Sequence, residues 1–296
     1  MTAAALSLGL SPKRAVATRV PVPAVNGEAD HLSELELKLT TLQQQYAELN
    51  TAIFEAAQVH RRLCAPSMVH YGPFNIASEI FAVRHLPGDF FTVEKTTDGL
   101  VLALGDIGGK GLAAGMWVSH LAGLIRTHTA ASSSPETIVA SVNRDVARLS
   151  SVAPLSSLFV ARLNADWETL SYFNAGHPAA LLLRADGDLE SLSDGGPVLG
   201  VVPEASFDCG IVRIDPGDAL LICSDGILES FDQAEQEFGN RRLEDEFRRA
   251  QGGSPEAMLF SVLGAVQDFA APRPLTDDMT LVLITRERSI HHDEGP

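Results

Sequence analysis

The sequence has few cysteines, a shortage of basic residues and no long apolar run. The three cysteines among 296 residues are Cys64, Cys209 and Cys223, which lie far apart and form no C-x-x-C pair. This spacing predicts reduced thiols in a cytoplasmic protein. Neither a membrane-spanning apolar run nor an apolar signal core is present, so we expect no membrane segment and no secretion signal.

The charge balance limits the classes of partner. The chain has 38 acidic and 22 basic residues, which gives a net charge of −16. Nucleic acid and anionic membranes attract cationic surfaces. We therefore expect neither of them as a partner.

Composition and hydrophobic patterning divide the chain into four segments. Residues 1–30 are rich in Ala, Pro, Val and Ser without a clear period, and they are predicted to form a flexible tail. Residues 31–66 are predicted to form a long helix, and residues 67–287 a folded domain with a sizeable core. Residues 288–296 form a polar tail.

The predicted helix carries a heptad pattern. Ser33 and Glu36 match a capping box, and apolar residues recur at alternating spacings of 4 and 3 from Leu35 to Leu63, with His60 in one of the positions. Such a pattern, held over about four heptads, is typical of a coiled coil. Two interpretations stay open: a parallel dimer through residues 33–63, or one amphipathic helix packed on its own domain. In both, Ala65-Pro66 should end the helix.

The remainder alternates short apolar segments with two pairs of helical patterns. Strands are predicted at 78–86, 90–94, 100–105, 157–163, 169–174, 179–184, 209–214, 219–224 and 279–285. Helices are predicted at 111–128, 135–150, 239–251 and 255–269. Because most strands follow one another as hairpins, the pattern favours an α+β fold with largely antiparallel sheets and helices on the outer faces.

One glycine-rich stretch, LVLALGDIGGKGLAAGMW, ends its apolar run at Asp106. A phosphate-binding P-loop is excluded because Lys110 is followed by Gly111 rather than by Ser or Thr. Gly109, Gly111 and Ala114 fit a dinucleotide fingerprint, but the acidic residue expected about 20 positions later is missing. The remaining interpretation makes Asp106 a metal ligand with open space beside it.

Other acidic residues share the position of Asp106 at the edge of an apolar strand. They are Asp89, Asp225, Asp277 and Asp278. A single strand-end aspartate is usually a turn residue, but a set of them without His or Cys partners suits Mg²⁺ or Mn²⁺ better than Zn²⁺. Two such ions about 3.5–4 Å apart form a clamp for phosphate-ester hydrolysis.

Five motifs occur in the following order along the chain: GDFF, GDIGGKGLAAGMW, NAGHPAALLLR, GDALLICSDGILES and DDMTLVLI. They resemble the metal-dependent protein phosphatase (PPM) family, in its bacterial SpoIIE/RsbU-like branch, from about Ser78 to Arg286. The resemblance implies an α/β/β/α sandwich with two central, mainly antiparallel sheets and a site for two Mn²⁺ or Mg²⁺ ions at one end.

The resemblance also implies roles for single residues. Asp106 would bridge both ions, the carbonyl of Ile107 would join one of them, and Asp225 and Asp277 would hold the other. Asp89 matches an upstream acidic ligand. Asp278 falls where relatives have Asn, so it is expected behind the ligands or as an alternative to Asp277. His177 stands where eukaryotic relatives place a third-metal aspartate, and a turn histidine is the expectation there. Lys110 is a candidate phosphate contact.

The function implied by the resemblance is serine/threonine protein phosphatase. The implied substrate is a phosphorylated STAS-domain anti-anti-sigma factor in a partner-switching pathway. An alternative is a catalytically silent module of the same fold that binds a sigma-regulating partner.

Overall fold

The structure is a computed structural model that describes residues 26–64, 68–132, 134–149 and 152–288. Its contacts separate two units, Met1–Asn50 and Thr51–Pro296. Of the predicted tails at residues 1–30 and 288–296, residues 1–25 and 289–296 lie outside the described residues, as do Ala65 and Pro66. Among the described residues, no helix combines the length and the apolar character needed to cross a bilayer.

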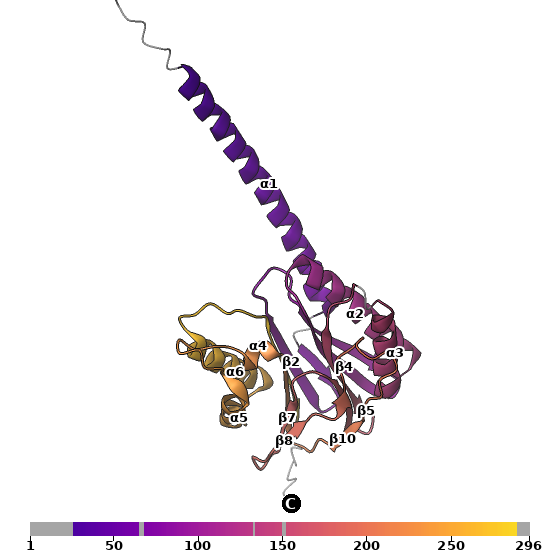
Figure 1. The fold of residues 1–296 in the computed structure, drawn as a ribbon. Coiled ribbons are helices and arrows are strands. Elements are labelled where there is room, and N and C mark those ends of the chain that lie inside the picture. Colours follow the sequence, from indigo (N-terminus) through magenta and orange to yellow (C-terminus); the bar gives the residue numbers. More distant parts are fainter. Residues whose placement is uncertain (1–25, 65–67, 133, 150–151, 289–296) are drawn as a thin grey trace, which may run out of the picture. The chain divides into compact units, whose positions relative to one another are not determined.

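The larger unit is built on two sheets (Figure 1). In the first sheet, neighbouring strands run antiparallel in the order β1-β2-β12-β11-β7-β8. Its strands are β1 (Met68–Tyr71), β2 (Phe74–Phe81), β7 (Ala180–Leu183), β8 (Leu189–Leu192), β11 (Ala219–Cys223) and β12 (Met279–Arg286).

The second sheet has the antiparallel order β10-β6-β5-β4-β3, with β9 added in parallel to β6. Its strands are β3 (Asp89–Thr96), β4 (Gly99–Ile107), β5 (Ser156–Asn164), β6 (Thr169–Ala175), β9 (Gly195–Gly196) and β10 (Gly210–Arg213).

Helices cover the outer face of each sheet. The helices α2 (Leu112–Ala131) and α3 (Pro135–Arg148) pack on the second sheet, and α5 (Gly239–Ala250) and α6 (Pro255–Ala270) pack on the first. A short helix, α4 (Asp225–Leu228), follows β11. This four-layer arrangement confirms the predicted α/β/β/α sandwich, and Figure 1 shows the two helix pairs on opposite sides.

Burial on both faces explains why the central strands are apolar without alternation. In β3, Phe90 belongs to the apolar layer under α2 and α3, whereas Phe91 belongs to the layer between the sheets. Successive side chains of a strand point to opposite faces, so both phenylalanines are fully buried. The same rule explains the run Leu100–Leu104, all of which is buried within β4.

The first described element is the helix α1 (Asn26–Cys64). It begins before Ser33, so the predicted capping box is wrong, and residues 26–30, assigned to the tail, are helical. Ala and Glu are strong helix formers, and Glu28-Ala29 extends the helix in this direction. The seam residues Leu39, Leu42 and Leu49 are exposed in the single chain.

The strand predicted at 78–86 is displaced, because β2 ends at Phe81. The backbone after it leaves the sheet, since the carboxylate of Asp278 accepts hydrogen bonds from the amides of Val83 and Gly88 at 2.7 and 2.8 Å. Sequence patterning also missed β1, β8, β9 and α4, which are short. The remaining predicted helices and strands are confirmed with ends shifted by a few residues.

One aromatic contact joins the two sheets. Tyr71 of β1 stacks on Trp167, which lies between β5 and β6, with ring centroids 5.7 Å apart. Gly72 follows with a φ of +58°, and a Cβ built there would lie 1.3 Å from the Trp167 ring. Only glycine fits this approach, because both the conformation and the space exclude a side chain.

We therefore expect Gly72→Ala to destabilise the larger unit by more than about 2 kcal/mol, since the indole must move or the turn must open. The matched control is Gly187→Ala, where φ is +98° but nothing lies within 4 Å of the added Cβ. That change should cost only the conformational strain, about 1 kcal/mol. Chemical denaturation measures both; equal costs would contradict the role given to the Trp167 contact.

Candidate metal centre

The candidate acidic residues come from strand ends that meet at one end of the sandwich. Asp89 begins β3 and lies directly opposite Asp106 near the end of β4. In the other sheet, Asp225 follows β11, while Asp277 and Asp278 precede β12, which pairs antiparallel with β11. Antiparallel pairing places the end of one strand beside the start of the next. Each sheet therefore contributes acidic residues to the same edge.

One hydrogen bond joins the two sheets at this edge, and a second joins neighbouring segments of the first sheet. The hydroxyl of Thr280 in β12 donates to Asp89 Oδ2 at 2.6 Å, and the backbone amide of Thr280 donates to the Ser224 hydroxyl at 2.9 Å. Asp278, which is buried, holds the loop before β3 through the amides of Val83 and Gly88. Both carboxylate oxygens of Asp278 are thus engaged by backbone, whereas Asp277 is half exposed.

Gly88 leaves a small space lined by oxygen atoms. A Cβ built on Gly88 would lie 2.8 Å from the Ile107 carbonyl, 3.0 Å from the Gly109 carbonyl and 3.6 Å from Asp106 Oδ1. These atoms are two carbonyl oxygens and one carboxylate oxygen, the donors that hard divalent cations prefer. Any side chain at position 88 would fill this oxygen-lined space.

A second glycine brings Asp225 close to Asp277. A Cβ built on Gly226 would lie 2.0 Å from the Asp278 carbonyl oxygen and 3.3 Å from Asp277 Cβ. Only glycine permits this approach of α4 to the segment before β12. Lys110 is also present, because its ammonium lies 2.8 Å from Asp277 Oδ1 and donates to the Thr276 carbonyl. A cationic group thus lies at the open side of the acidic residues.

Burial and the crowding of negative charge raise the pKa values of three of these aspartates. Burial, followed by repulsion from Asp225, raises the pKa of Asp106 from 3.8 to about 6. Burial and repulsion from Asp106 raise the pKa of Asp89, and burial and repulsion from Asp277 raise the pKa of Asp225. Each negative charge therefore disfavours ionisation of the neighbouring carboxyl groups, and a bound cation would favour it.

Among the described residues, no three His, Cys, Asp or Glu side chains converge so that they could hold an ion as they stand. Asp277 lies against Lys110, and Asp89 is hydrogen-bonded to Thr280. The donor chemistry nevertheless fits divalent metal, since carboxylates that repel one another border a space lined by carbonyl oxygens. The candidate ligands expected from the sequence all belong to this edge of the sandwich: Asp89, Asp106, Ile107 through its carbonyl, Asp225 and Asp277.

Several further residues support this edge and are not among the residues predicted for the site. Ser224 and Thr280 form the hydrogen bonds described above, and their signal is adjacency to Asp225 and Asp278 in the CSDG and DDMT motifs. Ser157, whose Cα pairs with that of Asp106, lies 2.9 Å from His177 Nδ1 through its hydroxyl. His177 is buried, and burial lowers its pKa to about 3. A neutral histidine in the turn agrees with the expectation for this position.

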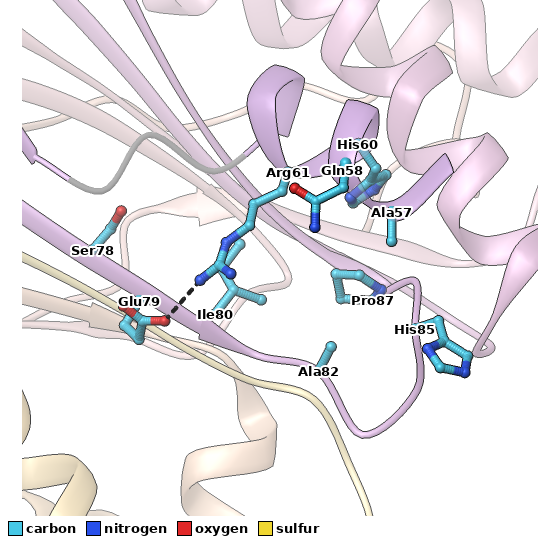
Figure 2. Close-up of a pocket in the computed structure, with 10 residues that line it drawn as sticks. All are labelled: Ala57, Gln58, His60, Arg61, Ser78, Glu79, Ile80, Ala82, His85 and Pro87. Carbon is cyan, nitrogen blue, oxygen red and sulfur yellow. Dashed lines mark hydrogen bonds and ion pairs between the residues drawn. The ribbon is translucent and has the colours of Figure 1, made fainter. Parts of the chain in front are cut away.

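A separate cavity of about 150 Å³ lies between the end of α1 and the segment around β2 (Figure 2). His60, Arg61, Glu79 and Pro87 contribute to its lining, and Arg61 pairs with Glu79 at 3.3 Å. Glu79 is its only carboxylate among the described lining residues. This cavity therefore lacks the oxygen donors of the strand-end edge, which stays the candidate site.

Solved structures identify the class of fold. The SiaA-PP2C domain of Pseudomonas aeruginosa matches with a TM-score of 0.69 at 18% identity, covering 82% of this chain and 98% of that domain. The sandwich with acidic residues at one end is therefore the PP2C-type, or PPM, phosphatase fold.

The family follows from the sequence model for stage II sporulation protein E (SpoIIE), which matches residues 96–287. The chain belongs to the SpoIIE family. The phosphoserine phosphatase RsbU of Bacillus subtilis is 23% identical over 252 residues, which are 83% of this chain and 73% of RsbU. Protein IcfG of Synechocystis is 24% identical over 214 residues, and this chain spans 34% of its length.

The charge crowding predicts opposite effects of Asp106→Asn with and without metal. Because the pKa of Asp106 is raised in the folded state, stability is lost as pH rises from about 4 to about 6. In chelator at pH 8, the uncharged Asn should therefore raise the melting temperature by a few degrees, and this gain should fade below pH 6.

Adding Mn²⁺ should reverse the order. At 100 times the dissociation constant, a ligand specific for the folded state contributes about 2.7 kcal/mol. The wild type should gain this stability and Asp106→Asn should not. Differential scanning calorimetry measures both conditions. A variant that is less stable than the wild type in chelator at pH 8 would contradict the electrostatic account.

Proposed function

We propose that the chain is a metal-dependent phosphatase that hydrolyses phosphoserine or phosphothreonine on a regulatory protein. The observation that carries the proposal is the crowding of Asp106, Asp225 and Asp277 at one end of the sandwich, where burial and the charges of the other two carboxylates raise the pKa of Asp106. Asp106 there also borders a space lined by the Ile107 and Gly109 carbonyls. Membership of the SpoIIE family supports the reaction class. The similarity to RsbU, whose name states a phosphoserine phosphatase activity, supports the type of phosphoester.

The finer proposal concerns cofactors and substrate. Two Mn²⁺ or Mg²⁺ ions, when bound, would supply charge neutralisation for the phosphate and activation of water. In this proposal Asp106 would contact both ions, and Asp225 and Asp277 would hold one of them. The substrate we propose is a phosphorylated STAS-domain anti-anti-sigma factor in a partner-switching pathway, by analogy with the family.

Other residues of this edge would support the ligands and attract the phosphate. Asp89 accepts a hydrogen bond from Thr280, and Asp278 accepts hydrogen bonds from two backbone amides. These bonds hold the segments that carry the candidate ligands. Lys110 lies at the open side of the site, where an ammonium group would attract a phosphate dianion. A cytoplasmic location stays part of the proposal and rests on the unpaired, widely spaced cysteines.

Turnover of p-nitrophenyl phosphate and of a phosphoserine peptide tests the proposal. With Mn²⁺ or Mg²⁺, the wild type should hydrolyse both, and Asp106→Asn should fall to background because a carboxylate shared by two ions is lost. The matched control is Asp186→Asn, the same change in an exposed turn. Absence of turnover by folded wild type with both metals would favour the silent binding module instead.

We also infer that residues 33–63 pair with a second copy of the chain. The seam side chains in the first unit are exposed along α1: Leu35, Leu39, Leu42, Tyr46 and Leu49. Apolar side chains at heptad spacing become buried when two helices supercoil. This contact would make a parallel homodimer.

Leu42→Asp combined with Leu49→Asp should convert this dimer to a monomer, since burying each unpaired carboxylate costs several kcal/mol. The control pair Thr40→Asp and Gln44→Asp adds the same charge off the seam and should leave the dimer intact. Light scattering at tens of micromolar measures the mass. A monomeric wild type would refute the coiled coil.

A further inference from the structure

Beside the candidate metal centre lies an exposed apolar surface that the chemistry described so far does not use. A shallow hollow of about 360 Å³ is bordered by the glycine-rich loop, by α2 and by the segment before β5. A second hollow of about 240 Å³ continues from it towards residues 199–201. Ala153 and Pro154 line both hollows. We call the two together the apolar groove.

The apolar groove begins at the site itself. Gly108, Gly109 and Lys110 line the first hollow. The Gly109 carbonyl also faces the oxygen-lined space beside Gly88, and Lys110 pairs with Asp277. A phosphorylated side chain that reached the acidic residues would therefore place its neighbouring residues next to this groove.

The lining has an unusual charge for this chain. Although the net charge is −16, Lys110 is the only charged residue among the described residues that line the two hollows. The rest are apolar or glycine, and Val152 and Leu155 are 67% and 66% exposed. Such a surface fits a segment that carries one phosphate and apolar side chains near it.

The backbone of the groove is fixed even though its side chains are free. Gly108 donates to the Leu155 carbonyl at 2.8 Å, and Leu199 donates to the Ser156 carbonyl at 3.0 Å. Trp117 is half-buried and packs against the apolar layer under α2 and α3. A partner would therefore meet a preformed surface, which lowers the ordering cost of binding.

We propose that the apolar groove binds apolar side chains that flank the phosphorylated residue of the substrate protein. The proposal rests on the phosphatase function proposed above and names a specificity determinant for it. Val152 and Leu155 are the contacts that can be changed without disturbing the interior, because both side chains are exposed.

Two phosphoserine peptides of equal length and charge test the proposal, one with Leu and one with Ser on both sides of the phosphoserine. The wild type with Mn²⁺ should show a KM about tenfold lower for the Leu peptide, from the burial of apolar side chains. Val152→Ser with Leu155→Ser should abolish this preference without changing turnover of p-nitrophenyl phosphate. Ile211→Ser, which removes an exposed apolar side chain on β10, should keep it.

Fluorescence anisotropy of the same labelled peptides should give the same ranking of affinities whether or not turnover occurs. This separates failure of the groove from failure of the phosphatase proposal, which would appear as no turnover of any substrate by the wild type. Equal binding of both peptides, or a preference unchanged in the double variant, would overturn the groove. A double variant that alters only the dimer in light scattering would also overturn it, by assigning the surface to self-contact.

Discussion

Repulsion among carboxylates at one end of the sandwich is the constraint on which the rest of this structure depends. Burial and proximity raise the pKa values of Asp89, Asp106 and Asp225, so bringing these carboxylates together costs free energy that the fold must offset. The offset comes from the three apolar layers and from hydrogen bonds across the sheets, above all Thr280 to Asp89. Stability elsewhere thus maintains an edge that favours a multivalent cation.

Backbone geometry brings the oxygen atoms of this edge close together. Gly88 leaves three oxygen atoms around a small space, and Gly226 lets Asp225 approach Asp277. Asp278 accepts hydrogen bonds from two backbone amides and so holds the loop that contains Gly88. The neighbouring apolar groove would supply the specificity for a substrate protein, because a phosphate site alone does not distinguish one phosphoprotein from another.

Much of the fold could be predicted because burial leaves clear patterns. The apolar run Leu100–Leu104 and the adjacent Phe90 and Phe91 are typical of strands that are covered on both faces. The order of the sequence motifs indicates the family. The displaced end of β2 could not be predicted, because Asp278 acts on Val83 from 195 positions away. Ser224 and Thr280 were missed for the same reason, since their hydrogen bonds join distant segments. The start of α1 was missed because a capping motif lies inside the helix.

The most direct test of the central claim is anomalous diffraction from crystals of the protein grown with Mn²⁺. The account predicts two manganese peaks that share the Asp106 carboxylate, each about 2.0–2.3 Å from its oxygen ligands. One peak should also contact the Ile107 carbonyl, and the other Asp225 and Asp277. Manganese peaks away from Asp106, or none at saturating Mn²⁺, would contradict the assignment of this edge as the metal centre.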